Sequence, residues 1–159
     1  MAEAMGSEFD ACIIEKVSST NVPTFQGVVP LISELKERGT LLAVLSNASG
    51  DYVRRVNQVH QIKSLFQVEW GADDAILPKP NPDGLLKILE IMALKNPNPD
   101  NTVYIGDSIS DGKAAQAAGI TSIGVTWGEN THATLEGSGA FDRIFTQVPE
   151  LAKFLLGDD

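Results

Sequence analysis

Two carboxylates stand four residues apart in Gly106-Asp107-Ser108-Ile109-Ser110-Asp111, directly after the apolar run 102–105. Hard oxygen donors of this kind suit Mg²⁺, which proteins usually hold with one or two carboxylates together with phosphate and water. Asp111 alone could instead be an acid at a helix start, where it complements the helix dipole. Asp107 is harder to explain structurally, because an unpaired carboxylate at a buried strand end is costly. Both are candidate metal ligands.

Three further residues could bind a phosphoryl group. Ser46 and Asn47 follow the apolar run 40–45 and precede a predicted helix, whose free N–H groups and positive dipole end attract anions. Either residue could also serve only as a helix cap. Lys79 stands between prolines in a rigid loop, where its ammonium can neutralise phosphate, although a lone loop lysine is usually solvated. We take Ser46, Asn47 and Lys79 as candidate phosphate-binding and catalytic residues.

An alternation of strands and helices must position these residues. Apolar periodicity and Gly or Pro stops predict helices over 8–18, 28–38, 85–92, 111–118 and 149–156, with another around 52–56. Strands are predicted at 40–45, 66–70, 102–105, 121–125 and 143–145, the first of them buried on both faces. This order predicts an α/β fold with a mostly parallel sheet, whose ligands bind beyond the carboxyl ends of the strands.

Composition restricts the class of protein. The chain has 159 residues, a net charge of -9 and 43% hydrophobic residues, with no apolar run near the roughly 20 residues that span a bilayer. The negative charge disfavours nucleic acid, since such binding rests on Lys and Arg. The single Cys12 cannot form an internal disulfide, which favours a cytoplasmic setting. We expect no membrane partner and no nucleic-acid partner.

Three segments, in their order and spacing, resemble the second, third and fourth motifs of the haloacid dehalogenase (HAD) superfamily. They are Leu45-Ser46-Asn47, Lys79-Pro80-Asn81-Pro82-Asp83 and Gly106-Asp107-Ser108 through Asp111. Trp70-Gly71-Ala72-Asp73 and Gly124-Val125-Thr126-Trp127-Gly128 are most similar to the phosphoglycolate-phosphatase branch. The resemblance runs from about residue 27 to the end. It implies a Rossmann-like core and Mg²⁺-dependent hydrolysis of a small phosphomonoester.

The resemblance also implies a role for each residue. Ser46, with Asn47 beside it, would donate to the phosphoryl oxygens, and Lys79 would offset the developing charge. Asp107 would coordinate magnesium, and Asp111 would support the metal or orient the lysine. Lys79 and Asp107 should therefore share one phosphate and its metal.

The family's opening strand, which ends in a nucleophilic Asp-x-Asp, has no counterpart in this sequence. We therefore divide the chain into residues 1–24, a remnant of the family's mobile cap, and residues 25–159, the core. Gly6-Ser7-Glu8-Phe9 is a tetrapeptide that two joined cloning sites would encode, so part of the start could be vector-derived. With the first strand and most of the cap absent, we expect an open or collapsed sheet centre.

These observations predict that the parent protein is a phosphatase for a small phosphorylated metabolite and that this chain alone is inactive. The rival interpretation is a non-catalytic phosphate-binding or regulatory module. Dehalogenase or phosphomutase chemistry is a further alternative within the family. We also expect self-association, or a separate N-terminal segment that completes the fold.

Overall fold

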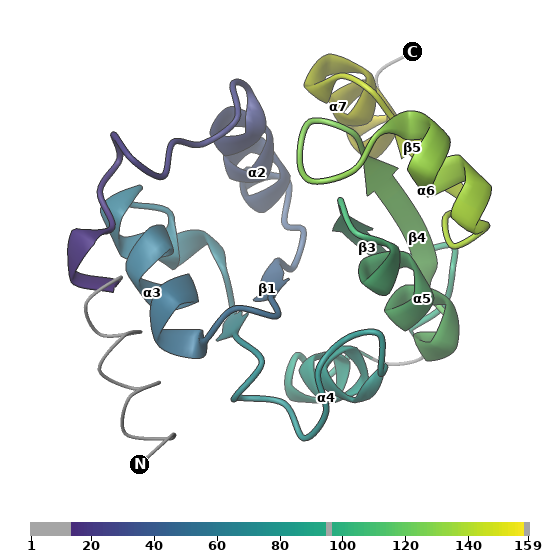
Figure 1. Cartoon of the computed structure of the whole chain (residues 1–159), viewed down its shortest axis with the longest axis horizontal. Coiled ribbons are helices and arrows are strands. Elements are labelled where there is room, and N and C mark those ends of the chain that lie inside the picture. Colours follow the sequence, from purple (N-terminus) through teal and green to yellow (C-terminus); the bar gives the residue numbers. More distant parts are fainter. Residues whose placement is uncertain (1–13, 95–96, 158–159) are drawn as a thin grey trace.

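The computed structural model describes residues 14–94 and 97–157, in which helices and strands alternate (Figure 1). The helices are α2 (Val28–Glu37), α3 (Gly50–Val59), α4 (Asp83–Ile91), α5 (Ile109–Ala118), α6 (His132–Ser138) and α7 (Val148–Leu156), with a 3₁₀ turn at Lys63–Leu65. The strands are β1 (Ala43–Leu45), β2 (Val68–Trp70), β3 (Val103–Gly106), β4 (Thr121–Val125) and β5 (Arg143–Phe145). No helix in these ranges combines the length and the apolar character that a membrane crossing needs.

All strands are parallel to their neighbours, and they form two sheets, which agrees with the expected open sheet centre. β1 pairs with β2, and β3, β4 and β5 form a second sheet in that order. The predicted α/β class is therefore confirmed. Within the described ranges no strand joins β1 to β3, so the centre is open rather than closed by direct pairing of these two strands.

The edges that face this open centre are exposed. The Thr121 N–H donates to the Thr102 carbonyl, which turns Thr102 toward β4. Because peptide groups alternate along a strand, those of Val103 and Ile105 point to the opposite edge. The two residues are 39% and 36% exposed. The prediction that β1 is buried on both faces is wrong, because Ala43 is exposed and only Leu45 of this strand is fully buried.

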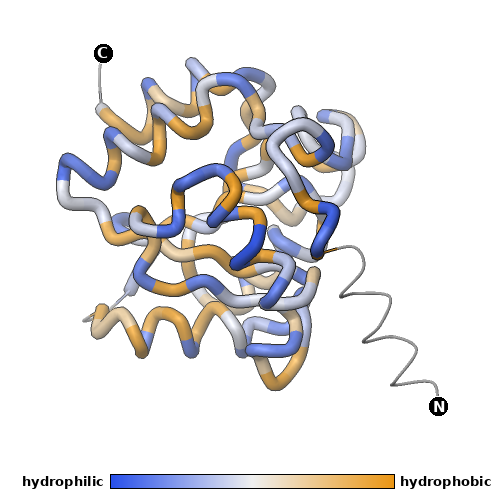
Figure 2. Tube along the Cα trace, turned by 90° about the vertical axis from the view of Figure 1, so that its left-hand side faces the viewer, coloured by the Kyte–Doolittle hydropathy of each residue, from blue (hydrophilic) through white to orange (hydrophobic). Residues whose placement is uncertain are grey.

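Two hydrophobic clusters pack the helices against the strands, and the one that contains Tyr104 of β3 together with Leu45 of β1 links the two sheets. One joins β1 and β2 to α4 and α5, and it contains Leu45, Val68, Leu85, Ile88 and Ala115 among others. The other joins α2 and α7 to β4, through residues such as Leu31, Ile123 and Leu151. Figure 2 shows hydrophobic residues recurring between hydrophilic ones along α7, the helix that leads to the C-terminus. Each cluster thus contributes apolar burial, the main favourable term in folding.

Local sequence signals explain most helix ends. Gly39 and Gly119 follow α2 and α5 with φ of 86° and 73°, a conformation that glycine adopts without a Cβ penalty. Of the helix predicted at 8–18, residues 14–16 are helical and residues 8–13 lie outside the described ranges. Helix α6 has no counterpart among the predicted elements. Its N-cap, Thr131, accepts from the Thr134 N–H, and Gly139 ends it after seven residues.

Candidate functional site

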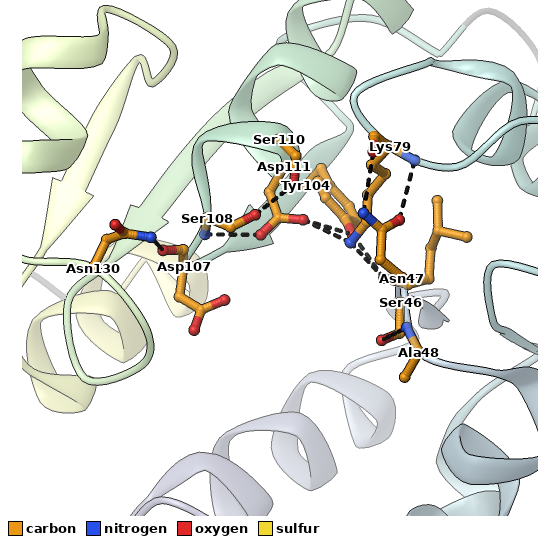
Figure 3. Close-up of polar contacts among 11 residues, drawn as sticks. Ser46, Asn47, Ala48, Lys79, Tyr104, Asp107, Ser108, Ser110, Asp111 and Asn130 are labelled. Atoms are coloured by element: carbon orange, nitrogen blue, oxygen red, sulfur yellow. Dashed lines mark hydrogen bonds and ion pairs between the residues drawn. The ribbon is translucent and has the colours of Figure 1, made fainter. Parts of the chain in front are cut away.

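A lysine ammonium forms the centre of the site. Lys79 Nζ donates to Asp111 Oδ1 at 2.6 Å, to the Tyr104 hydroxyl at 2.8 Å and to the Leu45 carbonyl at 3.1 Å (Figure 3). An ammonium has three N–H donors, so these acceptors use all of them. The Lys79 and Asp111 side chains are 8% and 6% exposed. The loop lysine is therefore a buried, paired cation rather than a solvated one.

Tyr104 bridges the two sheets at this point. It lies on β3, and its hydroxyl donates to the Leu45 carbonyl on β1 at 2.8 Å while accepting from Lys79. Burial raises the pKa of Tyr104 well above its ordinary value of 10.0, and the Asp111 and Asp107 carboxylates raise it further. The hydroxyl therefore keeps its proton and stays a donor.

Asn47 contacts the backbone of the same lysine. Its Nδ2 donates to the Lys79 carbonyl and its Oδ1 accepts from the Lys79 N–H, both at 3.1 Å. The sequence predicts that Asn47 binds phosphate, but the structure directs its amide group to the loop that carries Lys79. The Lys79–Pro80 peptide in that loop is cis.

Ser46 ends β1 and begins the loop before α3. Its Oγ accepts from the Ala48 N–H at 3.1 Å, which leaves the hydroxyl's own proton as a donor. The start of α3 is capped by other residues, since Ser49 accepts from the Tyr52 N–H and Asp73 from the Gly50 N–H. The helix-cap alternative for Ser46 is therefore not what the structure has.

Asp111 has the structural role that its position at a helix start predicts, together with the lysine contact. It is the third residue of α5, and its Oδ2 accepts from the Ser108 N–H at 3.0 Å in a capping box. Its other oxygen accepts from Lys79. Asp111 thus orients the lysine and caps the helix at the same time.

Asp107 is held by the loop that follows β4. The Glu129 N–H donates to Asp107 Oδ2 at 2.6 Å, and Asn130 Nδ2 donates to the Asp107 carbonyl at 3.0 Å. Gly128 lies against the carboxylate so closely that a Cβ there would overlap it. In Figure 3, Asp107 and Ser46 flank the Lys79–Asp111 pair, one from the β3 side and one from the β1 side.

The donor set fits Mg²⁺ in a limited way. The described residues contain no group of three or more His, Cys, Asp or Glu that could hold a metal. One or two carboxylates, completed by phosphate and water, are nevertheless the usual protein share of a magnesium site. Asp107 can provide such a ligand, whereas both oxygens of Asp111 already accept hydrogen bonds. The assignment of Asp111 to the metal stays a prediction.

A protein-family model described as haloacid dehalogenase-like hydrolase matches residues 4–125. The chain belongs to this family. Phosphoglycolate phosphatase from Escherichia coli K12 is 34% identical over 127 residues, covering 80% of this chain and 49% of that protein. The HAD chain therefore spans about half the length of this curated relative. The similarity places the chain with the phosphoglycolate-phosphatase-like branch, as the sequence predicts.

Solved structures agree with the HAD assignment. A predicted phosphoglycolate phosphatase from Haemophilus somnus superposes with a TM-score of 0.74 at 27% identity, over 82% of this chain and 56% of that one. A HAD family hydrolase from Deinococcus radiodurans, solved with bound phosphate and sodium, has a TM-score of 0.72 at 24% identity, over 84% of this chain and 59% of that one. The second likeness shows the fold alone.

Sequence reasoning missed Tyr104, Asn130 and Gly128 in this HAD site. Tyr104 carries a signal in retrospect, because it is a polar aromatic residue inside an otherwise apolar strand that leads to Asp107. A buried tyrosine hydroxyl usually finds a hydrogen-bond partner. Gly128 carries a signal only as part of the segment that resembles the phosphoglycolate-phosphatase branch, and Asn130 carries none. The relation of both to Asp107 depends on how the loop after β4 returns to β3.

Proposed function

We propose that this chain carries the phosphate-binding and magnesium-binding part of a HAD phosphatase that hydrolyses a small phosphomonoester of the phosphoglycolate type. The observation that carries the proposal is the buried Lys79–Asp111 pair, with Ser46 and Asp107 on either side of it at strand ends. Ligands of parallel α/β folds bind at such carboxyl ends. The family membership and the named relatives support the same reaction class.

Each residue has a role that its contacts support. Ser46 donates its hydroxyl proton to a phosphoryl oxygen, because the Ala48 N–H uses only an acceptor position of the hydroxyl and leaves its proton available. Lys79 places its positive charge beside the same group. Asp107 holds the metal, in a position fixed by the loop after β4. Mg²⁺, when bound, supplies the charge that neutralises the phosphoryl oxygens.

The charges of the site make metal and phosphate binding interdependent. One ammonium, on Lys79, and two carboxylates, on Asp107 and Asp111, belong to this site, so the charges of these three side chains sum to a negative value. An anion is repelled until a divalent cation reverses this balance. Linkage then requires that Mg²⁺ strengthens phosphate binding and that phosphate strengthens Mg²⁺ binding by the same factor.

We further propose that the chain by itself binds without turning over. Its sequence has no Asp-x-Asp, and loss of a covalent nucleophile removes rate on the order of 10⁶-fold. This observation also favours the second candidate function, a phosphate-binding or regulatory module. Dehalogenase and phosphomutase chemistry need the same nucleophile and are not favoured by any contact in the structure.

The open centre suggests a partner for the fold. The edges of β1 and β3 that face the open centre have peptide groups with which a further strand could pair. Val103 and Ile105 of β3 are exposed at this edge. We propose that an N-terminal segment of the family type completes this centre and brings the nucleophile, and that copies of the chain associate when it is absent. The single cysteine supports a reducing, cytoplasmic setting.

Titration calorimetry with inorganic phosphate, with and without saturating Mg²⁺, tests the proposed site. We expect weak binding that Mg²⁺ strengthens, that Asp107→Asn makes independent of Mg²⁺, and that Lys79→Met abolishes. Phosphate affinity unaffected by Mg²⁺ would contradict the shared site. Hydrolysis of p-nitrophenyl phosphate above the level of Asp107→Ala would show that the isolated chain is catalytic after all.

A further inference from the structure

Two uncharged residues hold Lys79, one at its backbone and one at its ammonium group. Asn47 forms two hydrogen bonds with its backbone, and Tyr104 accepts from its ammonium. The two residues come from different sheets, Asn47 from the end of β1 and Tyr104 from β3.

Such support matters because a lysine side chain is long and flexible. Its four-carbon stem loses considerable rotamer entropy when it is fixed in one position. The loop around Lys79 contributes no helix or strand that would hold it. The Asn47 amide replaces that missing support, since it pairs with the Lys79 N–H and carbonyl as a neighbouring strand would.

The Tyr104 hydroxyl has a second effect, on the Leu45 carbonyl. This carbonyl accepts from both Lys79 and Tyr104. The other two acceptors of the ammonium are the Tyr104 hydroxyl and Asp111. When Lys79 turns one N–H toward a phosphoryl oxygen, Leu45 can release it and still keep the tyrosine as a partner. No buried carbonyl is then left unpaired, which would cost free energy.

We propose that Asn47 and Tyr104 are positioning residues for Lys79: Asn47 fixes its backbone, and Tyr104 fixes its ammonium and allows one N–H to pass from Leu45 to phosphate. This inference rests on the proposed function, because it assumes that Lys79 binds a phosphoryl oxygen at this site. It also changes the role that the sequence gives Asn47, from phosphate ligand to support of the lysine. Tyr104 is otherwise a core residue, packed against the cluster of α4 and α5.

The test separates the hydroxyl from the packing of the ring. In ¹H–¹⁵N spectra of lysine ammonium groups, we expect a Lys79 signal in the full chain, because its protons are buried and bonded. Tyr104→Phe keeps the ring and should speed exchange of these protons with solvent about fivefold, as loss of one hydrogen bond predicts. Asn47→Ala should broaden the same signal. Tyr52→Phe, at the chain's other tyrosine, and Asn21→Ala, at an asparagine that bonds the Lys16 carbonyl, are matched controls that should change nothing.

Phosphate titrations in the presence of Mg²⁺ give the second readout. Tyr104→Phe and Asn47→Ala should each weaken phosphate binding about fivefold while leaving Mg²⁺ binding to the phosphate-free chain unchanged. The positioning role would be overturned if the unmodified chain gave no Lys79 signal, or if neither variant changed that signal relative to the unmodified chain. If the signal responds as expected but the unmodified chain binds no phosphate, the positioning stands and the proposed function fails.

Discussion

Lys79→Met should cost far more stability than an ordinary lysine substitution, because it breaks a buried ion pair. The side chains of Lys79 and Asp111 are 8% and 6% exposed, and their charged atoms are 2.6 Å apart. Removing one partner of such a pair typically costs about 3–5 kcal/mol, since the other charge stays buried without compensation. Asp111 would keep the Ser108 N–H, so we expect a value near the lower limit, about 3 kcal/mol.

The matched control is Lys87→Met. Lys87 also pairs with a carboxylate, that of Glu90 at 2.7 Å, but the two side chains are 54% and 69% exposed. Water screens such a pair, so its loss should change the free energy of unfolding by less than about 0.5 kcal/mol. The contrast between the two lysines isolates burial, because the chemical change is the same.

Urea unfolding followed by circular dichroism gives these free energies, and a double-mutant cycle assigns them to the pair. Asp111→Asn keeps an acceptor for Ser108 and removes the charge. The double variant with Lys79→Met should lose about 2 kcal/mol less free energy of unfolding than the sum of the two single variants, because no unpaired charge remains buried. A Lys79→Met cost below about 1 kcal/mol, or a cycle that is additive, would refute the view of a buried, mutually dependent pair.

Gly128→Ala should weaken Mg²⁺ binding in calorimetry at least tenfold, because the added Cβ displaces the Asp107 carboxylate. Gly137→Ala, where a Cβ meets no neighbour, should leave the affinity unchanged. Equal Mg²⁺ affinities of the two variants would contradict the close contact between Gly128 and Asp107. Because burial, then the Asp111 and Asp107 carboxylates, raise the pKa of Tyr104, its contribution to stability is complete below pH 10.0 and falls as the pH rises toward the higher folded-state value. Urea midpoints measured from pH 9 to 11 should therefore drop more steeply for the unmodified chain than for Tyr104→Phe, and parallel curves would count against this. Ile105→Lys, at the exposed edge of β3, should lower the oligomer fraction seen by light scattering, and an unchanged mass would argue against association through that edge.

Sequence patterns alone determined much of the secondary structure and the identity of the family. Glycine stops at Gly39 and Gly119 and continuous apolar runs mark elements because they act through local backbone geometry and burial. β4 and β5 have the predicted bounds, 121–125 and 143–145. The resemblance of the segments around Ser46, Lys79 and Asp107 to HAD motifs likewise indicated the family, since the order and spacing of motifs are properties of the sequence itself.

Only the tertiary structure decided how these residues are used. Asn47 and Ser46 are neighbours in sequence, yet one supports the Lys79 backbone and the other keeps a free hydroxyl donor. Tyr104 reaches Lys79 across 25 residues of sequence, and Glu129 reaches Asp107 across 22. No local pattern encodes such contacts, because they depend on how two separate sheets pack through shared helices. The same packing decides that β1 and β3 stay apart, which periodicity within either strand cannot reveal.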